Sequence, residues 1–113
     1  MELDLVNELQ AKTRQLEKSI KALRINGVEF AQAERDYKIL LRQEVLKLRD
    51  QGLAVGLIEK VCYGIPSVAE ARFKRDVCKT TYEANQDAIN GLKLQMRLLD
   101  SQISREWSTP VSS

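Results

Sequence analysis

The chain has 113 residues, of which 43% are hydrophobic and 30% charged, with five glycines and two prolines. This composition excludes a disordered or loop-built protein and predicts long helices. The 18 basic and 16 acidic side chains nearly cancel, and the chain lacks histidine, the usual general base and metal ligand. We therefore expect a non-enzymatic protein with no catalytic residue, no bound metal and no cofactor.

Features of secretion and membrane insertion are missing from the sequence. The longest uncharged stretch near the middle covers residues 52–58, far short of the roughly 20 residues that span a bilayer. The first residues, Met1-Glu2-Leu3-Asp4, lack the basic and apolar regions of a signal peptide. Cys62 and Cys78 have no second thiol near them, so we expect reduced, buried thiols. We expect a cytoplasmic protein that binds no membrane.

A heptad pattern runs through the first 24 residues. Its members recur at alternating spacings of three and four: Val6, Leu9, Thr13, Leu16, Ile20 and Leu23. β-Branched residues at the a positions and leucines at the d positions are typical of parallel two-stranded coiled coils. The same stripe would serve for packing inside one chain, as most amphipathic helices of small domains do. The pattern predicts a helix and slightly favours the intramolecular use of its seam.

Asn26-Gly27 marks the expected boundary between the first and second helices. Asn26 can cap a helix, because Glu29 stands at the capping-box position three residues later. Gly52 can adopt the left-handed conformation that ends a helix. We expect an antiparallel helical hairpin around Asn26-Gly27, followed by a short connecting helix within residues 53–62. The apolar stripe of the second helix consists of Phe30, Ala33, Tyr37, Leu41, Val45 and Leu48.

The third expected helix has the clearest start. Ser67 and Glu70 form a capping box directly after Pro66, so the helix should begin at Val68. It should continue to Trp107, which gives roughly 40 residues and 60 Å at 1.5 Å per residue. One seam along it consists of Cys78, Tyr82, Asn85, Ile89, Leu92, Met96, Leu99 and Ile103, and a second stripe of Ala84, Ala88, Gly91, Leu94 and Leu98. Two stripes imply contacts with more than one helix, and the sequence leaves open which is intermolecular.

Self-association is the main functional expectation. The third helix is longer than either predicted partner helix, so part of it should project and bind a second copy. Asn85 stands at a core position where a polar side chain often sets the register of a coiled coil. Trp107 is either an exposed partner anchor or a cap on the end of the bundle. The candidate dimer or partner interface is Asn85, Ile89, Leu92, Met96, Leu99, Ile103 and Trp107.

A basic cluster near the start of the third helix offers an alternative function. Arg72, Arg75 and Lys79 are the candidate contacts with nucleic acid, since basic side chains bind phosphates. Asp76 lies among them and Glu83 follows Lys79 at the i+4 position, so a solvated face of ion pairs is favoured over a phosphate track.

Residues 57–67 superficially resemble a helix-turn-helix motif. Lys60 and Glu70 then fall where that motif packs a small and an apolar side chain. We therefore favour a simple corner between two helices.

Several short runs between residues 48 and 107 stand out together. They are Leu48-Arg49-Asp50-Gln51-Gly52, Phe73-Lys74-Arg75-Asp76-Val77, Tyr82-Glu83-Ala84, Ala88-Ile89-Asn90, Lys93, Arg97 and Arg105-Glu106-Trp107. These runs resemble a family of small helical proteins of phages and prophages of Gram-positive bacteria. The resemblance covers about residues 33–107 and implies a phage accessory protein acting in the host cytoplasm, with no active site to carry over.

The sequence thus predicts an all-α protein in which an antiparallel helical hairpin packs with a long third helix of coiled-coil character. Residues 1–107 form one helical domain and residues 108–113 a disordered tail. We expect a homodimer that binds a protein of the replication, recombination or defence machinery. The alternative is a nucleic-acid-binding accessory factor that uses the basic helix face.

Overall fold

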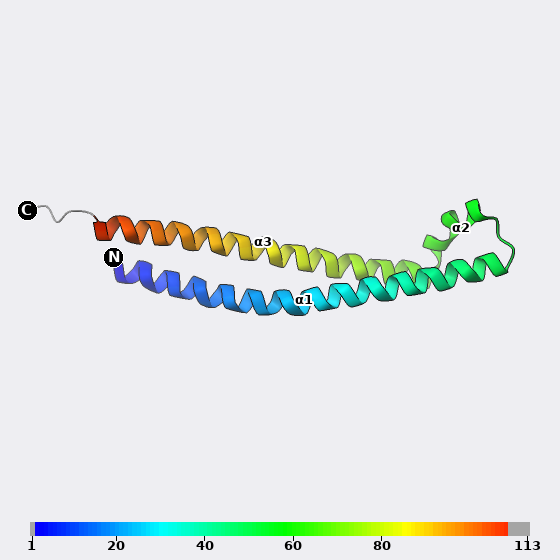
Figure 1. Ribbon diagram of the computed structural model, residues 1–113, viewed down its shortest axis with the longest axis horizontal. Coiled ribbons are helices and arrows are strands. Elements are labelled where there is room, and N and C mark those ends of the chain that lie inside the picture. The colour runs from blue at the N-terminus through cyan, green and yellow to red at the C-terminus, as the bar shows by residue number, and fades with distance from the viewer. Residues whose placement is uncertain (1, 109–113) are drawn as a thin grey trace, which may run out of the picture. The chain divides into compact units, whose positions relative to one another are not determined.

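The computed structural model describes residues 2–108, which are almost entirely helical (Figure 1). Helix α1 is Glu2–Asp50, α2 is Val55–Val61 and α3 is Pro66–Ser108, with a 3-10 turn, η1, at Cys62–Gly64. The predicted all-α class, long final helix and short connecting helix are confirmed. The tail expected from residue 108 lies outside the described residues, apart from Ser108, which ends α3.

The hairpin predicted at Asn26-Gly27 is wrong, because α1 continues through both residues without a break. Tertiary packing accounts for the unbroken helix. The ring of Tyr82 on α3 lies so close to Gly27 that a Cβ atom added there would be 3.3 Å from it. The Tyr82 ring also packs against Phe30, with ring centroids 6.0 Å apart. This aromatic contact outweighs the roughly 1 kcal/mol that a helical glycine costs relative to alanine. The antiparallel hairpin is instead formed by α1 and α3.

The lengths of the long helices correct a second expectation. Helix α1 has 49 residues and α3 has 43, so the last helix is not longer than the helix it pairs with. An argument for self-association therefore has to come from exposed side chains and not from a surplus of helix.

The end of α1 follows the sequence closely. Gly52 has a φ of 85°, its N–H donates to the carbonyl of Arg49, and the Leu53 N–H donates to the carbonyl of Leu48. These two bonds form a Schellman motif, in which glycine supplies the left-handed residue. Gly52 therefore ends α1 as predicted.

Helix α3 begins at Pro66, two residues earlier than predicted. Ile65 has extended backbone angles of −65° and 126°, and its carbonyl accepts the N–H of Ala69. Ile65 is therefore the N-cap and Pro66 the first helical residue, a position where proline's missing N–H costs nothing. Ser67 lies inside the first turn, so the prediction that it caps the helix is wrong.

The chain divides into two compact units. Within the described residues, unit 1 consists of residues 2–24 of α1 and 84–108 of α3, and unit 2 is Ile25–Glu83. In each unit the α1 and α3 segments run side by side in opposite directions (Figure 1). Both long helices contribute to both units, so neither unit is a separate stretch of chain.

Unit 2 has a core drawn from every element. Ala33 and Tyr37 come from α1, Ile58 from α2, Cys62 from η1 and Val68 from α3, and each is at most 5% exposed. Val68 has no exposed surface at all. Apolar side chains from four elements thus converge, and α2 with η1 closes the core between the long helices.

Unit 1 is a pair of helix segments joined by a single seam. All six members of the N-terminal heptad pattern are half-buried, and Ile89 and Leu99 of α3 are at most 9% exposed. The hydroxyl of the polar seam residue Thr13 donates a hydrogen bond of 2.9 Å to the carbonyl of Leu9, so this hydroxyl has its partner within its own helix. The heptad seam therefore packs within the chain.

No helix in the described part of the chain is both long enough and apolar enough to cross a membrane.

Candidate interaction surfaces

The seam predicted as a dimer interface is largely used inside unit 1. Ile89 and Leu99 are buried, while Asn85, Leu92, Met96 and Ile103 are half-buried beside α1. The Asn85 side-chain amide donates to the carbonyl of Ser19 on α1 at 3.1 Å. This bond fixes the register of the two segments, the role expected of a polar seam residue, but within one chain. These six residues are therefore core positions of unit 1.

Trp107 is the exception among the predicted interface residues. Its side chain is 71% exposed near the end of α3. Leu3, near the start of α1 in the same unit, is 70% exposed. An indole that open to solvent does not cap the end of a helical bundle, so that interpretation of Trp107 is wrong, and its role as a partner anchor stays a prediction.

The second stripe of α3 faces solvent in unit 1. Its members, which we call the α3 stripe, are Ala84, Ala88, Gly91, Leu94 and Leu98, and all five are exposed. Leu94 is 52% and Leu98 61% exposed, and an added Cβ atom at Gly91 would meet nothing within 4 Å. The first seam therefore packs within the chain, whereas none of the described residues of unit 1 buries the α3 stripe.

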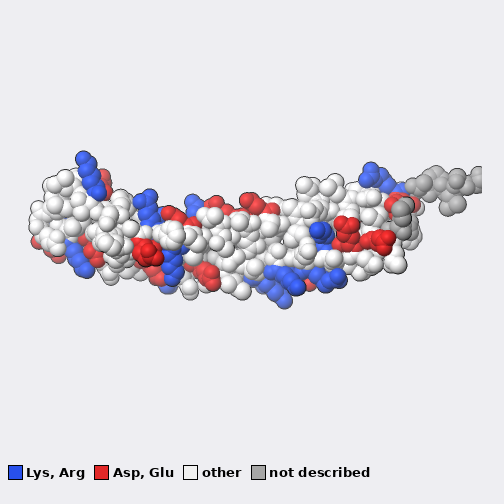
Figure 2. Space-filling view, turned by 180° about the vertical axis from the view of Figure 1, so that it is seen from behind, with Lys and Arg blue, Asp and Glu red and all other residues white. Residues whose placement is uncertain are grey.

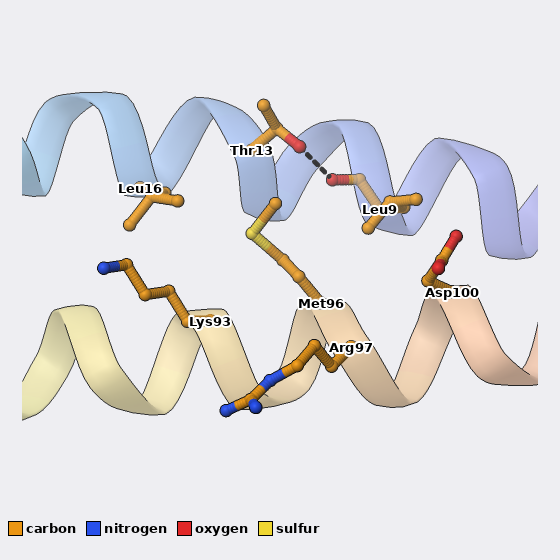
Figure 3. A pocket seen from close by; sticks show the side chains of 7 residues that line it. All are labelled: Leu9, Thr13, Leu16, Lys93, Met96, Arg97 and Asp100. Atoms are coloured by element: carbon orange, nitrogen blue, oxygen red, sulfur yellow. Dashed lines mark hydrogen bonds between the residues drawn. The ribbon is translucent and has the colours of Figure 1, made fainter.

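A groove of about 630 Å³ lies between the two helix segments of unit 1 (Figure 3). Leu9, Thr13 and Leu16 line it from α1, and Lys93, Met96, Arg97 and Asp100 line it from α3. In Figure 3 the Met96 side chain points from α3 towards α1, between Leu9 and Leu16. The apolar part of the lining, which we call the floor, is Leu9, Leu16 and Met96, and the charged side chains, which we call the rim, all come from α3.

The rim of this groove carries two positive charges and one negative charge. Lys93 reaches towards α1 beside Leu16, Arg97 lies along α3, and Asp100 points towards α1 (Figure 3). A surface with an apolar floor and a net positive rim suits an amphipathic segment that also carries acidic side chains.

Sequence reasoning missed this groove as a site. Lys93 and Arg97 stand at i and i+4 beside the seam, so they share a helix face. That spacing was the available signal, but it did not show which residues of α1 lie opposite them.

Unit 2 carries exposed apolar side chains around its short elements. Val55 is 72% exposed, Leu57 49%, Val61 44% and Tyr63 45%. A smaller hollow of about 400 Å³ lies here, lined by Leu41, Val45, Arg49, Val55, Ile58, Glu59, Cys62 and Tyr63. The α2 segment therefore buries Ile58 on its inner side and leaves several apolar side chains in solvent.

Two candidate nucleic-acid contacts are engaged in unit 2. The Arg75 guanidinium lies 4.7 Å from the centre of the Tyr37 ring and its Nε donates to Asp76 at 2.7 Å. The side chain of Arg75 is 21% exposed, so it serves the packing of α3 against α1. Arg72 lies 5.1 Å from the centre of the Tyr63 ring. Both arginines therefore make a cation–π contact with a tyrosine of unit 2.

The third candidate contact is paired as well. Lys79 Nζ lies 3.9 Å from a carboxylate oxygen of Glu83, one helical turn later. In Figure 2 basic and acidic side chains are interspersed with wide uncharged areas over the face drawn. The three candidates therefore lie along one helix, and each has an aromatic or acidic side chain beside it.

The thiols and carboxylates of the described residues form no cluster that would hold a metal. Cys62 is buried and Cys78 half-buried, both as free cysteines. No three Cys, Asp or Glu side chains come together in that part of the chain.

Comparison with known proteins finds no match to this chain among protein-family models, curated proteins or solved structures.

Proposed function

We propose that this chain is a non-enzymatic helical interaction module that forms a homodimer and binds a second, different protein. The observation that carries the proposal is the number of large apolar side chains left in solvent along the helices. Fourteen such residues are at least 44% exposed, and they occur in both units. Exposed apolar side chains that lie close together mark sites of protein association, and Val55, Leu57, Val61 and Tyr63 of the consecutive elements α2 and η1 are such a group.

The groove of unit 1 supports an amphipathic helix as the binding element of the partner. Its floor of Leu9, Leu16 and Met96 offers apolar contact, and Lys93 with Arg97 would pair with acidic side chains at the edge of such a helix. Helix-in-groove binding places apolar residues of the partner at i, i+3, i+4 and i+7, which a groove parallel to two helices can accept.

The biological setting in this proposal comes from the sequence resemblance. A phage or prophage accessory protein of this kind would act on a protein of the host or phage replication, recombination or defence machinery. A homodimer would present two grooves to such a partner, which raises the avidity for an oligomeric target.

Affinity purification from the host tests the proposal. Tagged wild-type protein should capture a partner that is lost when Lys93→Glu and Arg97→Glu are combined, because the positive rim is reversed. The matched control is Lys18→Glu with Lys21→Glu, which makes the same change of charge at exposed positions of α1 outside the groove. Retention of the partner by both variants would show that the groove is not its site.

Salt dependence separates this function from nucleic-acid binding. Contact with a protein through the apolar floor should weaken only modestly from about 0.15 M to about 1 M salt, as the pairs with Lys93 and Arg97 are screened, whereas phosphate contacts lose affinity steeply. We expect DNA and RNA to bind no tighter than the non-specific range of about 10⁻⁴ to 10⁻⁶ M. Tight, selective binding that disappears when Arg72, Arg75 and Lys79 become glutamate would establish the nucleic-acid function instead.

A further inference from the structure

Positive charge is concentrated in one short stretch of α1. Residues 12–24 carry five basic side chains and one acidic side chain, whereas the rest of the chain carries 13 basic and 15 acidic side chains. The five are Lys12, Arg14, Lys18, Lys21 and Arg24. In Figure 2 basic side chains gather along the lower edge, over α1. The positive net charge of the chain therefore comes from this stretch, which lies within unit 1.

The basic side chains of this stretch are not neutralised by acidic neighbours. Within the described residues none of the five forms an ion pair, although Glu17 stands four residues before Lys21. By contrast, Arg35, Lys38 and Lys47 on the part of α1 in unit 2 each pair with an acidic side chain. The charges of residues 12–24 are therefore available to a polyanion.

Three of these cations share one face of α1. At about 100° per residue, Lys18 lies about 40° to one side of Arg14 and Lys21 about 20° to the other. All three side chains are exposed, on the side of α1 away from the heptad seam. We call this arc of about 60° the basic face, and it extends over about 10.5 Å of helix. Glu17, the acidic residue of the stretch, lies about 40° outside it.

The basic face lacks the side chains that a membrane or the centre of a protein interface requires. Within residues 7–24 its arc contains Asn7 besides the three cations and no apolar side chain. Helices that lie in a membrane surface bury large apolar residues beside their cations, and the centre of a protein interface consists of desolvated, well-packed side chains. A face that offers charge alone suits phosphate groups, because their binding is mainly electrostatic.

We propose that the basic face binds double-stranded DNA through the phosphates of its backbone, without recognising the bases. Each strand of the duplex carries a phosphate about every 3.4 Å along the axis, so a face about 10.5 Å long can offer each cation its own phosphate. Single-stranded nucleic acid fits less well, because its sites stack bases on aromatic side chains and the first 29 residues contain none. The site goes beyond the proposed function, because it shares no residue with the groove.

The number of phosphate contacts determines how binding depends on salt. On B-DNA the slope of log K against log salt concentration is about −0.9 for each contact, because each contact releases condensed counterions. Three contacts give a slope of about −2.7, which is about a 40-fold loss of affinity between about 0.05 M and about 0.2 M salt. The dissociation constant at physiological salt belongs in the non-specific range of about 10⁻⁴ to 10⁻⁶ M.

Fluorescence anisotropy with a labelled DNA duplex of arbitrary sequence tests the proposal on the full chain. The combined change Arg14→Gln, Lys18→Gln and Lys21→Gln should lower the affinity at least about tenfold at about 0.05 M salt and flatten the salt slope. Circular dichroism should show unchanged helices, because all three positions are exposed and glutamine is a good helix former.

A control matched in charge lies on the same helix. Arg35→Gln, Lys38→Gln and Lys47→Gln remove the same number of positive charges from exposed positions of α1 that are already paired with acidic side chains. This control variant should bind the duplex with the affinity and salt slope of the wild type. Equal losses in both variants would show that net charge alone governs binding, and would overturn the proposal.

Two other results would also overturn it. The first is an absence of duplex binding by the wild type at about 0.05 M salt, where phosphate contacts are strongest. The second is binding to vesicles of phosphatidylcholine and phosphatidylglycerol, but not to the duplex, that is lost in the variant of the basic face. That second result would assign the basic face to an anionic membrane surface.

Discussion

Unit 2 buries side chains from four elements, among them Val68 with no exposed surface, whereas the described part of unit 1 buries Ile89 and Leu99 and leaves its other seam residues half-exposed. The same two helices run through both units, so the difference comes from α2 and η1, which belong to unit 2 alone. Two paired helices cover only one stripe of each other, and a third element covers more of their apolar surface. Unit 2 therefore supplies most of the internal packing, but it also carries ten of the fourteen large apolar side chains that are exposed, whereas unit 1 carries four.

The largest effect is expected from a charge in the seam of unit 1. Leu99→Asp replaces a side chain that is 9% exposed, so it should destabilise the chain by more than about 3 kcal/mol. The control is Leu98→Asp at the neighbouring position, which is 61% exposed and should leave the fold intact. Urea unfolding followed by circular dichroism compares the two. Equal destabilisation by both changes would show that the two faces of α3 are not distinct.

The role of α2 in unit 2 can be tested by shortening its buried side chain. Ile58→Ala should cost about 2 to 5 kcal/mol, because Ile58 is 4% exposed and the change leaves a cavity. Leu57→Ala, at a position that is 49% exposed, should cost much less. Thermal unfolding measures both, and hydrogen exchange should show that Ile58→Ala loosens residues of unit 2 first. Equal loss of protection in both units would contradict the claim that α2 stabilises unit 2 in particular.

A smaller effect is expected from the polar bond in the seam of unit 1. Asn85→Ala removes the donor to the Ser19 carbonyl and should cost about 1 kcal/mol. Asn85→Leu should keep or raise stability but weaken the register of the two segments. Denaturation midpoints report the stability of each variant, and line widths in methyl NMR spectra report the register. Sharp, unchanged spectra for Asn85→Leu would show that the other seam contacts set the register of the two segments without this bond.

The smallest effect concerns the start of α3. Ser67→Ala should change the free energy of unfolding by less than about 0.5 kcal/mol, because Ser67 is exposed within the first turn and Ile65 is the N-cap. Thermal unfolding of the Ser67→Ala variant and of the wild type measures this difference in free energy. A loss near 1 kcal/mol would restore Ser67 as the capping residue.

Local signals in the sequence were enough for several features of the fold. The 3.6-residue periodicity of apolar side chains predicted the long final helix, and Gly52 correctly marked the end of α1, because a left-handed residue is needed there. The inward stripe from Phe30 to Leu48 also faces the protein interior, with Ala33 and Tyr37 buried. Each of these features depends on residues close together in the chain.

Tertiary structure decided the rest. Asn26-Gly27 has the local character of a helix boundary, yet the Tyr82 ring packs on Gly27 from α3 and the helix continues. The seam from Asn85 to Ile103 and the α3 stripe are both apolar, and only the pairing of α3 with α1 shows which one is already covered. The groove beside Lys93 and Arg97 likewise depends on the residues of α1 that lie across from them. Periodicity determines which faces of a helix are apolar, but contacts between distant segments determine which of those faces are filled.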